Sequence, residues 1–176
     1  MLNAIELVLI CLVAQAGITD LAVRKIPNVL VLTGFVLALI LQLLHGAHWT
    51  PVVAWMAGAL AGFFLFLPLY VLGGMGAGDV KLMAMVGAFV GPLAALEIGL
   101  LVFLIGGVMA LAMMAYSGRL RDGWRNLLTL CRPPLMCMLG VPLLPEPLPH
   151  GASVGDMPYG LAIATGTLLL IAWSHC

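Results

Sequence analysis

The chain has 176 residues, of which 64% are hydrophobic and only 8% are charged. A soluble domain carries about 25% charged residues, and one of this length could not bury so much apolar surface, so the composition indicates an integral membrane protein. Seven basic and seven acidic residues give a formal net charge of zero. This balance excludes an electrostatic nucleic-acid binder, and the composition excludes a disordered chain and a disulfide scaffold.

Apolar runs divide the chain into about six membrane-spanning segments. A helix that crosses a bilayer needs about 20 apolar residues, so we expect roughly six spans with short connections and no separate soluble domain. The first run lacks the basic start and the small-residue cleavage site of a signal peptide, and we expect a permanent span there. In chain order, the spans are expected at about residues 2–18, 29–44, 52–72, 79–91, 94–116 and 158–173. The expected fold is an all-α integral membrane bundle of about six transmembrane helices.

The division between the fourth and fifth spans depends on one proline. Residues 82–116 contain a single charged residue, Glu97. As one helix they would extend about 52 Å, too long for one crossing of about 30 Å and slightly short for two. Because proline lacks an N–H group and disfavours helix before it, Gly91-Pro92 favours a break. The alternative is one long tilted helix, which leaves five spans and moves the C-terminus to the other side.

Residues 117–157 form the longest polar-leaning segment, which we expect to be a cytoplasmic or interfacial loop. Three arginines among apolar side chains favour an interfacial helix at its start, and six prolines prevent regular structure further on. With six spans, all seven basic residues fall on one side of the membrane, which the positive-inside rule makes cytoplasmic. Both termini are then expected outside, and residues 1–176 are expected to form a single transmembrane domain.

Asp20 and Asp79 are the acids best suited to chemistry. Acidic residues at membrane depth are costly and point to function. In the expected topology, Asp20 ends the first span and Asp79 begins the fourth, so both lie at the cytoplasmic face. Two carboxyl groups close together share a proton, so that one acts as a base on water and the other as an acid toward a carbonyl group. The pattern favours an aspartic protease, and the alternative is a boundary residue at Asp20 and a helix N-cap at Asp79.

Three motifs, in order along the chain, resemble those of the type IV prepilin peptidases, which are intramembrane aspartic proteases. The run Gly76-Ala-Gly-Asp79 looks like the GxGD signature of that family. The run Asp20-Leu-Ala-Val-Arg-Lys-Ile-Pro-Asn28 looks like its first-aspartate motif, and residues 157–163 are similar to its final-span entry. The resemblance covers essentially the whole chain, and it implies that Asp20 and Asp79 are the catalytic pair.

Residues around the two aspartates are expected to support this site. Glycines before Asp79 have no side chains, so a substrate backbone could approach closely. The basic pair after Asp20 has an alternative role as a topology anchor, and the lysine after Asp79 either tunes that aspartate or points to lipid headgroups. The asparagine after the Ile-Pro pair is expected to cap or hydrogen-bond near Asp20. The supporting residues are Gly76, Gly78, Lys81, Arg24, Lys25, Pro27 and Asn28.

The match is closest to the short members of the family, which serve tight-adherence (Flp) pili. The resemblance implies prepilin and pseudopilin substrates, a short basic leader cut after a glycine, and a site at the cytoplasmic face of the bacterial inner membrane. Longer members carry an additional region with two CxxC pairs that bind zinc, and they also methylate the new N-terminus. This sequence has four cysteines without a CxxC pair. We therefore expect no metal and no organic cofactor, and find no basis for methyl transfer. The lipid bilayer is the other expected partner, and the oligomeric state stays open.

Two alternatives come from other functional classes. The first is a proton-coupled transporter or channel that uses Asp20 and Asp79 as relay groups, and the second is a non-catalytic subunit of pilus assembly. The remaining acids have simpler interpretations. Glu6 lies 14 residues before Asp20, about 21 Å along one helix, and is expected near the outer interface or paired within the bundle. Glu97 is expected near the outer end of its span, Asp122 in a solvated ion pair, and Asp156 as a cap of the last helix.

Overall fold

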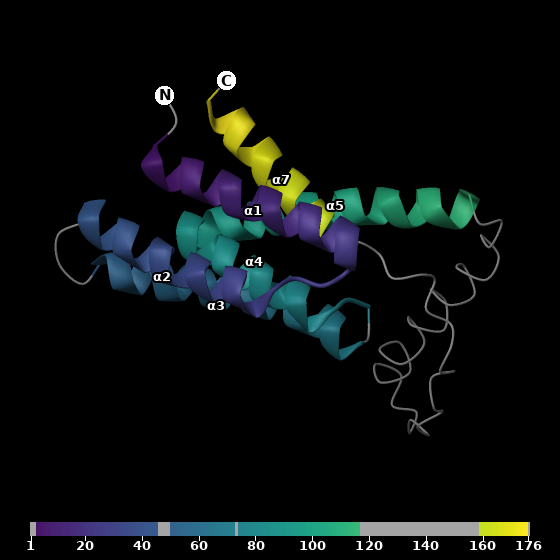
Figure 1. Cartoon of the computed structure of the whole chain (residues 1–176), viewed down its shortest axis with the longest axis horizontal. Coiled ribbons are helices and arrows are strands. Elements are labelled where there is room, and N and C mark those ends of the chain that lie inside the picture. The colour runs from purple at the N-terminus through teal and green to yellow at the C-terminus, as the bar shows by residue number, and fades with distance from the viewer. Residues whose placement is uncertain (1–2, 46–49, 73, 117–158, 176) are drawn as a thin grey trace, which may run out of the picture. The chain divides into compact units, whose positions relative to one another are not determined.

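The computed structural model describes residues 3–45, 50–72, 74–116 and 159–175. These residues form helices and short connections, without a strand in the described ranges. The helices are α1 (Ala4–Val23), α2 (Asn28–His45), α3 (Thr50–Val71), α4 (Ala77–Val90), α5 (Pro92–Tyr116) and α7 (Tyr159–Ser174), as shown in Figure 1. The expected all-α fold is confirmed.

Three of the described helices are long and apolar enough to cross a membrane. They are Ala4–Val23, Thr50–Val71 and the Pro92–Met113 part of α5. Two shorter helical segments, Asn28–Leu44 and Tyr159–Ser174, are also apolar. Many large apolar side chains on α2, α3 and α5 are exposed. A soluble protein rarely exposes so much apolar surface, and hydrocarbon chains cover it in a bilayer. The chain is therefore an α-helical membrane protein.

The structure separates into two compact units. One unit comprises Met1–Gly106 and Pro158–Cys176, and the other is Gly107–Met157. Of the second unit the structure describes the last turns of α5, residues 107–116. The interfacial helix and the loop expected within residues 117–157 lie outside the described residues. All the features below belong to the first unit unless stated otherwise.

Helix α4 forms the centre of the first unit. It packs against α1, α2, α3 and α7, and Figure 1 shows it between the α2–α3 pair and the α1–α7 pair. Residues 82–89 are all buried. At 14 residues α4 is about 21 Å long, too short to cross a bilayer core of about 30 Å. Its burial among other helices gives it a protein environment in place of lipid.

Glycines allow α3 and α4 to pack with their backbones in contact. A Cβ atom at Gly58 would collide with the carbonyl oxygen of Gly87, and one at Gly87 would collide with that of Gly58. A Cβ atom at Gly62 would likewise collide with the carbonyl oxygen of Met83. Close packing of this kind is a main source of helix association in membranes, where lipid chains remove the hydrophobic drive between helices.

The helical structure is interrupted between α4 and α5 at Gly91-Pro92, as the sequence predicts. Gly91 has φ of 83°, and its N–H donates to the carbonyl oxygen of Gly87 at 2.8 Å. Pro92 has no N–H to donate to the carbonyl oxygen of Ala88, four residues earlier. The side-chain amide of Gln42 on α2 supplies that donor instead, with Nε2 at 2.6 Å from the Ala88 oxygen. The break therefore forms two helices and not one long tilted helix.

Candidate active site

Asp20 lies inside α1 and not in a polar connection after it. The expected span ends at residue 18, but α1 continues to Val23. The hydroxyl group of Thr19 donates to the carbonyl oxygens of Gln15 and Ala16, so this polar side chain finds its hydrogen-bond partners within the helix. The helix then ends at Arg24, in the left-handed conformation with φ of 55°, and the Arg24 N–H donates to the Asp20 carbonyl oxygen at 2.9 Å. Asp20 therefore has a helical backbone and a buried side chain, only 6% exposed.

Asp79 lies in the first turn of α4, where it hydrogen-bonds back to the start of the helix. Its Oδ2 accepts a hydrogen bond from the Gly76 N–H at 3.1 Å, and its own N–H donates to the Gly76 carbonyl oxygen at 3.2 Å. Gly76 is the N-cap, so Asp79 is the third helical residue and not the cap itself. Like Asp20, Asp79 is buried, at 8% exposed.

Asp20 and Asp79 lie on helices that pack against each other, although 59 positions separate them in the sequence. Helix α1 packs against α4, and the charge of Asp20 acts electrostatically on Asp79. Asp20, Asp79 and Thr167 are the buried polar or charged residues of the described chain. Thr167 donates its hydroxyl group to the Ile163 carbonyl oxygen at 2.7 Å within its own helix, which explains its burial. Asp79 accepts a local hydrogen bond from the Gly76 N–H, whereas the Asp20 carboxyl group accepts one from α7, 140 positions away in the sequence.

Other residues of the two motifs lie around this pair. Lys81 Nζ donates to Asn28 Oδ1 at 3.3 Å, which links the start of α4 to the start of α2 at an exposed position. Gly78 faces the connection between α1 and α2, because a Cβ atom there would lie 3.4 Å from Ile26 Cβ. The Pro27 carbonyl oxygen accepts hydrogen bonds from the N–H groups of Leu30 and Val31 in the first turn of α2. The exposed bases are Arg24 and Lys25, and the charge of Arg24 acts on Asp20.

The start of α7 contributes to the site in a way the sequence did not reveal. The Gly160 N–H donates to Asp20 Oδ2 at 2.8 Å in a buried contact. Tyr159, next to it, is near enough to Asp79 to interact with its charge. The resemblance of residues 157–163 to a family segment was the available signal, but it assigned no role to either residue. A contact between residues 140 positions apart has no local sequence signature.

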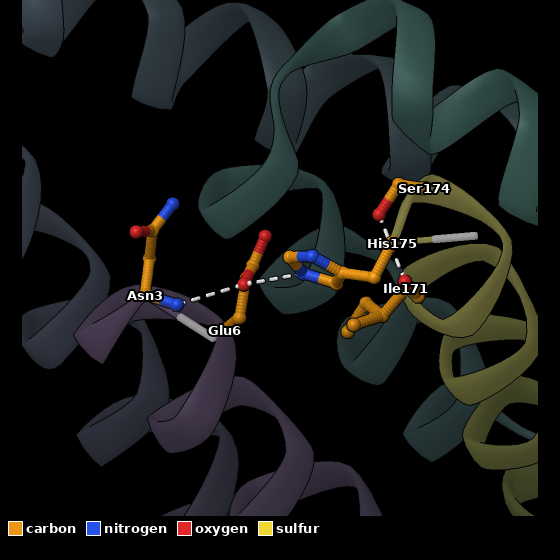
Figure 2. A network of polar contacts seen from close by, with 5 residues as sticks. All are labelled: Asn3, Glu6, Ile171, Ser174 and His175. Atoms are coloured by element: carbon orange, nitrogen blue, oxygen red, sulfur yellow. Dashed lines mark hydrogen bonds and ion pairs between the residues drawn. The ribbon is translucent and has the colours of Figure 1, made fainter. Parts of the chain in front are cut away.

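Glu6 lies at the other end of α1. Its Oε2 contacts His175 Nε2 at 3.0 Å and accepts a hydrogen bond from the Asn3 N–H at 2.9 Å, as Figure 2 shows. Ser174 donates to the Ile171 carbonyl oxygen at 2.8 Å in the same network. Glu6 is thus paired within the bundle, away from Asp20.

Of the other acidic candidates, Glu97 lies within the described residues. Glu97 is exposed on α5. Asp122 and Asp156 lie outside the described residues. Within the described part of the chain, no three His, Cys, Asp or Glu side chains lie together as a metal site requires.

The comparisons with known proteins identify the family. Neither the curated proteins nor the solved structures gave a match to the chain. A model of the type IV leader peptidase family matches residues 7–111, which is more than half of the chain and includes both Asp20 and Asp79. The family supports a leader-peptidase function, and hence a protease, in general terms. The chain belongs to the type IV leader peptidase family.

Proposed function

We propose that the protein is an intramembrane aspartic endopeptidase that removes leader peptides from type IV prepilins of the Flp type and from pseudopilins. The proposal rests mainly on one observation, the buried pair of Asp20 and Asp79 on two packed helices. Burying two acids in a membrane protein is costly, and such acids usually mark a functional site. Family membership makes peptide hydrolysis the chemistry that fits them.

The reaction needs one ionised and one protonated carboxyl group. The ionised carboxylate takes a proton from water, and the water oxygen attacks the carbonyl carbon of the scissile amide. The protonated carboxyl group donates its proton toward the carbonyl oxygen. Collapse of the tetrahedral intermediate breaks the C–N bond, and the departing nitrogen takes the proton that the first carboxyl group gained from water. A hydroxyl group of the intermediate gives its proton to the second carboxyl group as the new carboxyl product forms, which restores both groups to their starting states. Two neighbouring carboxyl groups favour the singly protonated state, because the first charge opposes the second.

The substrate is a short basic leader followed by an apolar helix, cut after a glycine at the cytoplasmic face. A glycine weakens the substrate helix by roughly 1 kcal/mol relative to alanine, which helps to expose the scissile amide. Gly76 and Gly78 leave room beside Asp79, and Lys81, Arg24, Lys25, Pro27 and Asn28 support the site. No metal or organic cofactor enters this mechanism.

The proposed location is the bacterial inner membrane, with the active site toward the cytoplasm and both termini outside. The contact between Glu6 and His175 supports placing both termini on the same side of the membrane, because it joins the start of α1 to the end of α7. We propose that residues 1–176 act as one transmembrane peptidase domain, in which residues 117–157 form the cytoplasmic or interfacial loop.

A cleavage assay in bacterial membranes tests this function. The protein is co-expressed with a tagged Flp-type prepilin, and loss of the leader is followed by the size shift on a gel. Asp20→Asn and Asp79→Asn are each expected to lower the rate by about 100-fold to 10,000-fold, the usual contribution of a general acid or base. Glu97→Gln is the matched control, since it neutralises an exposed acid on α5.

The variants must accumulate in the membrane to the level of the wild type. Cleavage by the wild type and by Glu97→Gln, with loss in both aspartate variants, supports the paired-aspartate mechanism. Undiminished cleavage by Asp20→Asn or Asp79→Asn assigns the chemistry to other carboxyl groups. If the wild type cleaves none of several prepilins, the peptidase proposal is wrong, and proton flux across the membrane becomes the next measurement.

A further inference from the structure

The first turn of α7 packs against the carboxyl group of Asp20. Gly160 donates its N–H to Asp20 Oδ2 at 2.8 Å in a buried contact. N–H groups in the first turn of a helix have no partner within the helix. Asp20 therefore provides the acceptor that the start of α7 needs, and α7 in turn fixes the orientation of Asp20.

This contact requires a glycine at position 160 for reasons of space. A Cβ atom there would lie 2.8 Å from Asp20 Oδ2, 2.9 Å from its Cβ and 3.0 Å from its Cγ. The Asp20 Cβ is bonded to the backbone of α1 and cannot rotate away, so α1 and α7 would have to separate. Backbone conformation gives no reason for a glycine here, because Gly91 is the residue with positive φ among the described glycines.

We propose that Gly160 is a positioning residue for the cleavage reaction. Its amide holds Asp20 in the orientation that the reaction needs, and its missing side chain lets α7 approach closely enough to do so. The Asp20 Oδ2 is engaged by α7, which leaves Oδ1 to exchange protons with water and substrate. Gly160 acts through Asp20, so the inference rests on the proposed function of that aspartate.

The kinetic test compares two glycines of the same helix interface. Gly17 on α1 also faces α7: a Cβ atom there would lie 3.2 Å from Ala164 Cβ, and at ordinary contact distances of 3.8 Å from Leu161 Cα and 3.9 Å from the Gly160 carbonyl oxygen. No atom of Asp20 is among these three nearest neighbours. Gly160→Ala is expected to lower kcat by about 100-fold with KM close to the wild-type value, because displacement of a catalytic group by about 1 Å has an effect of this size. Gly17→Ala is expected to keep kcat near the wild-type value.

A second measurement detects the contact without using catalysis. Thermal unfolding in detergent is compared for the wild type, Gly160→Ala, Asp20→Gly and the double variant. Asp20→Gly removes all three atoms that a Cβ atom at position 160 would meet. We expect Gly160→Ala to lower the unfolding temperature in the wild-type background and to have no effect, or to raise it, in the Asp20→Gly background.

The two measurements separate this inference from the proposed function. A wild-type value of kcat in Gly160→Ala overturns the positioning role, and so does an equal fall of kcat in Gly17→Ala. Equal shifts of the unfolding temperature in both backgrounds overturn the contact itself. If the wild type cleaves no prepilin, the proposed function fails, and the unfolding comparison alone decides whether Gly160 holds Asp20.

Discussion

Backbone conformation does not require a glycine at position 76, whereas the space beside Asp79 is tight for a side chain. Its φ of −79° and ψ of 153° are extended values that any residue adopts. A Cβ atom at Gly76 would lie 3.3 Å from Asp79 Oδ2, the oxygen that accepts the Gly76 N–H. Serine at a helix N-cap is as favourable as glycine or better by a few tenths of a kcal/mol. Serine would therefore suit the N-cap of α4 at least as well as the glycine that occupies it.

We therefore expect Gly76→Ser to keep the stability of α4 and to lose activity. Its side chain would stand beside the Asp79 carboxyl group, and its hydroxyl group would compete there with water and substrate. With the role proposed for Asp79, the expected fall in kcat is roughly 10-fold or more, since small displacements at a catalytic group have large effects. Ala77→Ser, at the next and also exposed position, is the control. Cleavage by Gly76→Ser at the wild-type rate would show that the open space is not needed.

Among the helices, α4 depends on α3 for its place in the bundle. Gly58 and Gly87 bring the two backbones into contact, and Gly62 continues this contact toward Met83. The atoms that a new Cβ would meet are backbone carbonyl oxygens, which cannot move without moving a helix. Since Asp79 lies in the first turn of α4, its position relative to Asp20 depends on this packing.

Gly58→Ala and Gly62→Ala are each expected to destabilise the protein by about 1–3 kcal/mol or more, the usual range for overpacking. Thermal unfolding in detergent and accumulation in the membrane measure the effect. Gly107→Ala, on the part of α5 that belongs to the second unit, is the control, because nothing lies within 4 Å of its Cβ position. There, alanine is expected to stabilise the helix by up to about 1 kcal/mol. Equal stability of all three variants would contradict close backbone packing between α3 and α4.

The elements also show which features a sequence can predict. The break before Pro92 follows from local chemistry, because proline lacks the N–H that a continuous helix needs. The replacement of that donor by Gln42, 46 positions from Ala88, has no local signal. The continuation of α1 past Asp20 was missed because a charged residue near the end of an apolar run resembles a boundary. The motifs identified both aspartates, but only the packed helices revealed Gly160 against Asp20.

At the scale of the whole first unit, the polar groups gather at opposite ends of α1. Asp20 lies in the last turn of the helix, beside the starts of α4 and α7. Glu6 lies in the first turn, beside His175 at the end of α7 (Figure 2). The rise of α1 between the two acids is about 21 Å. In a peptidase these groups have separate roles, because hydrolysis uses one end of the bundle, whereas a proton-coupled transporter needs polar groups along a path between both ends.

Glu6→Gln distinguishes these two functions. In a peptidase it removes a partner of His175 far from the reacting groups, so we expect cleavage at the wild-type rate. In a transporter it removes an acid at one end of the proton path, so proton flux would fall in Glu6→Gln as it would in Asp20→Asn. Prepilin cleavage in membranes and proton flux in vesicles are measured on the same variants, with His175→Ala as the matched change to the other partner. Loss of cleavage in both Glu6→Gln and His175→Ala would mean that the ends of α1 and α7 control the site, because neither side chain reaches Asp20 directly.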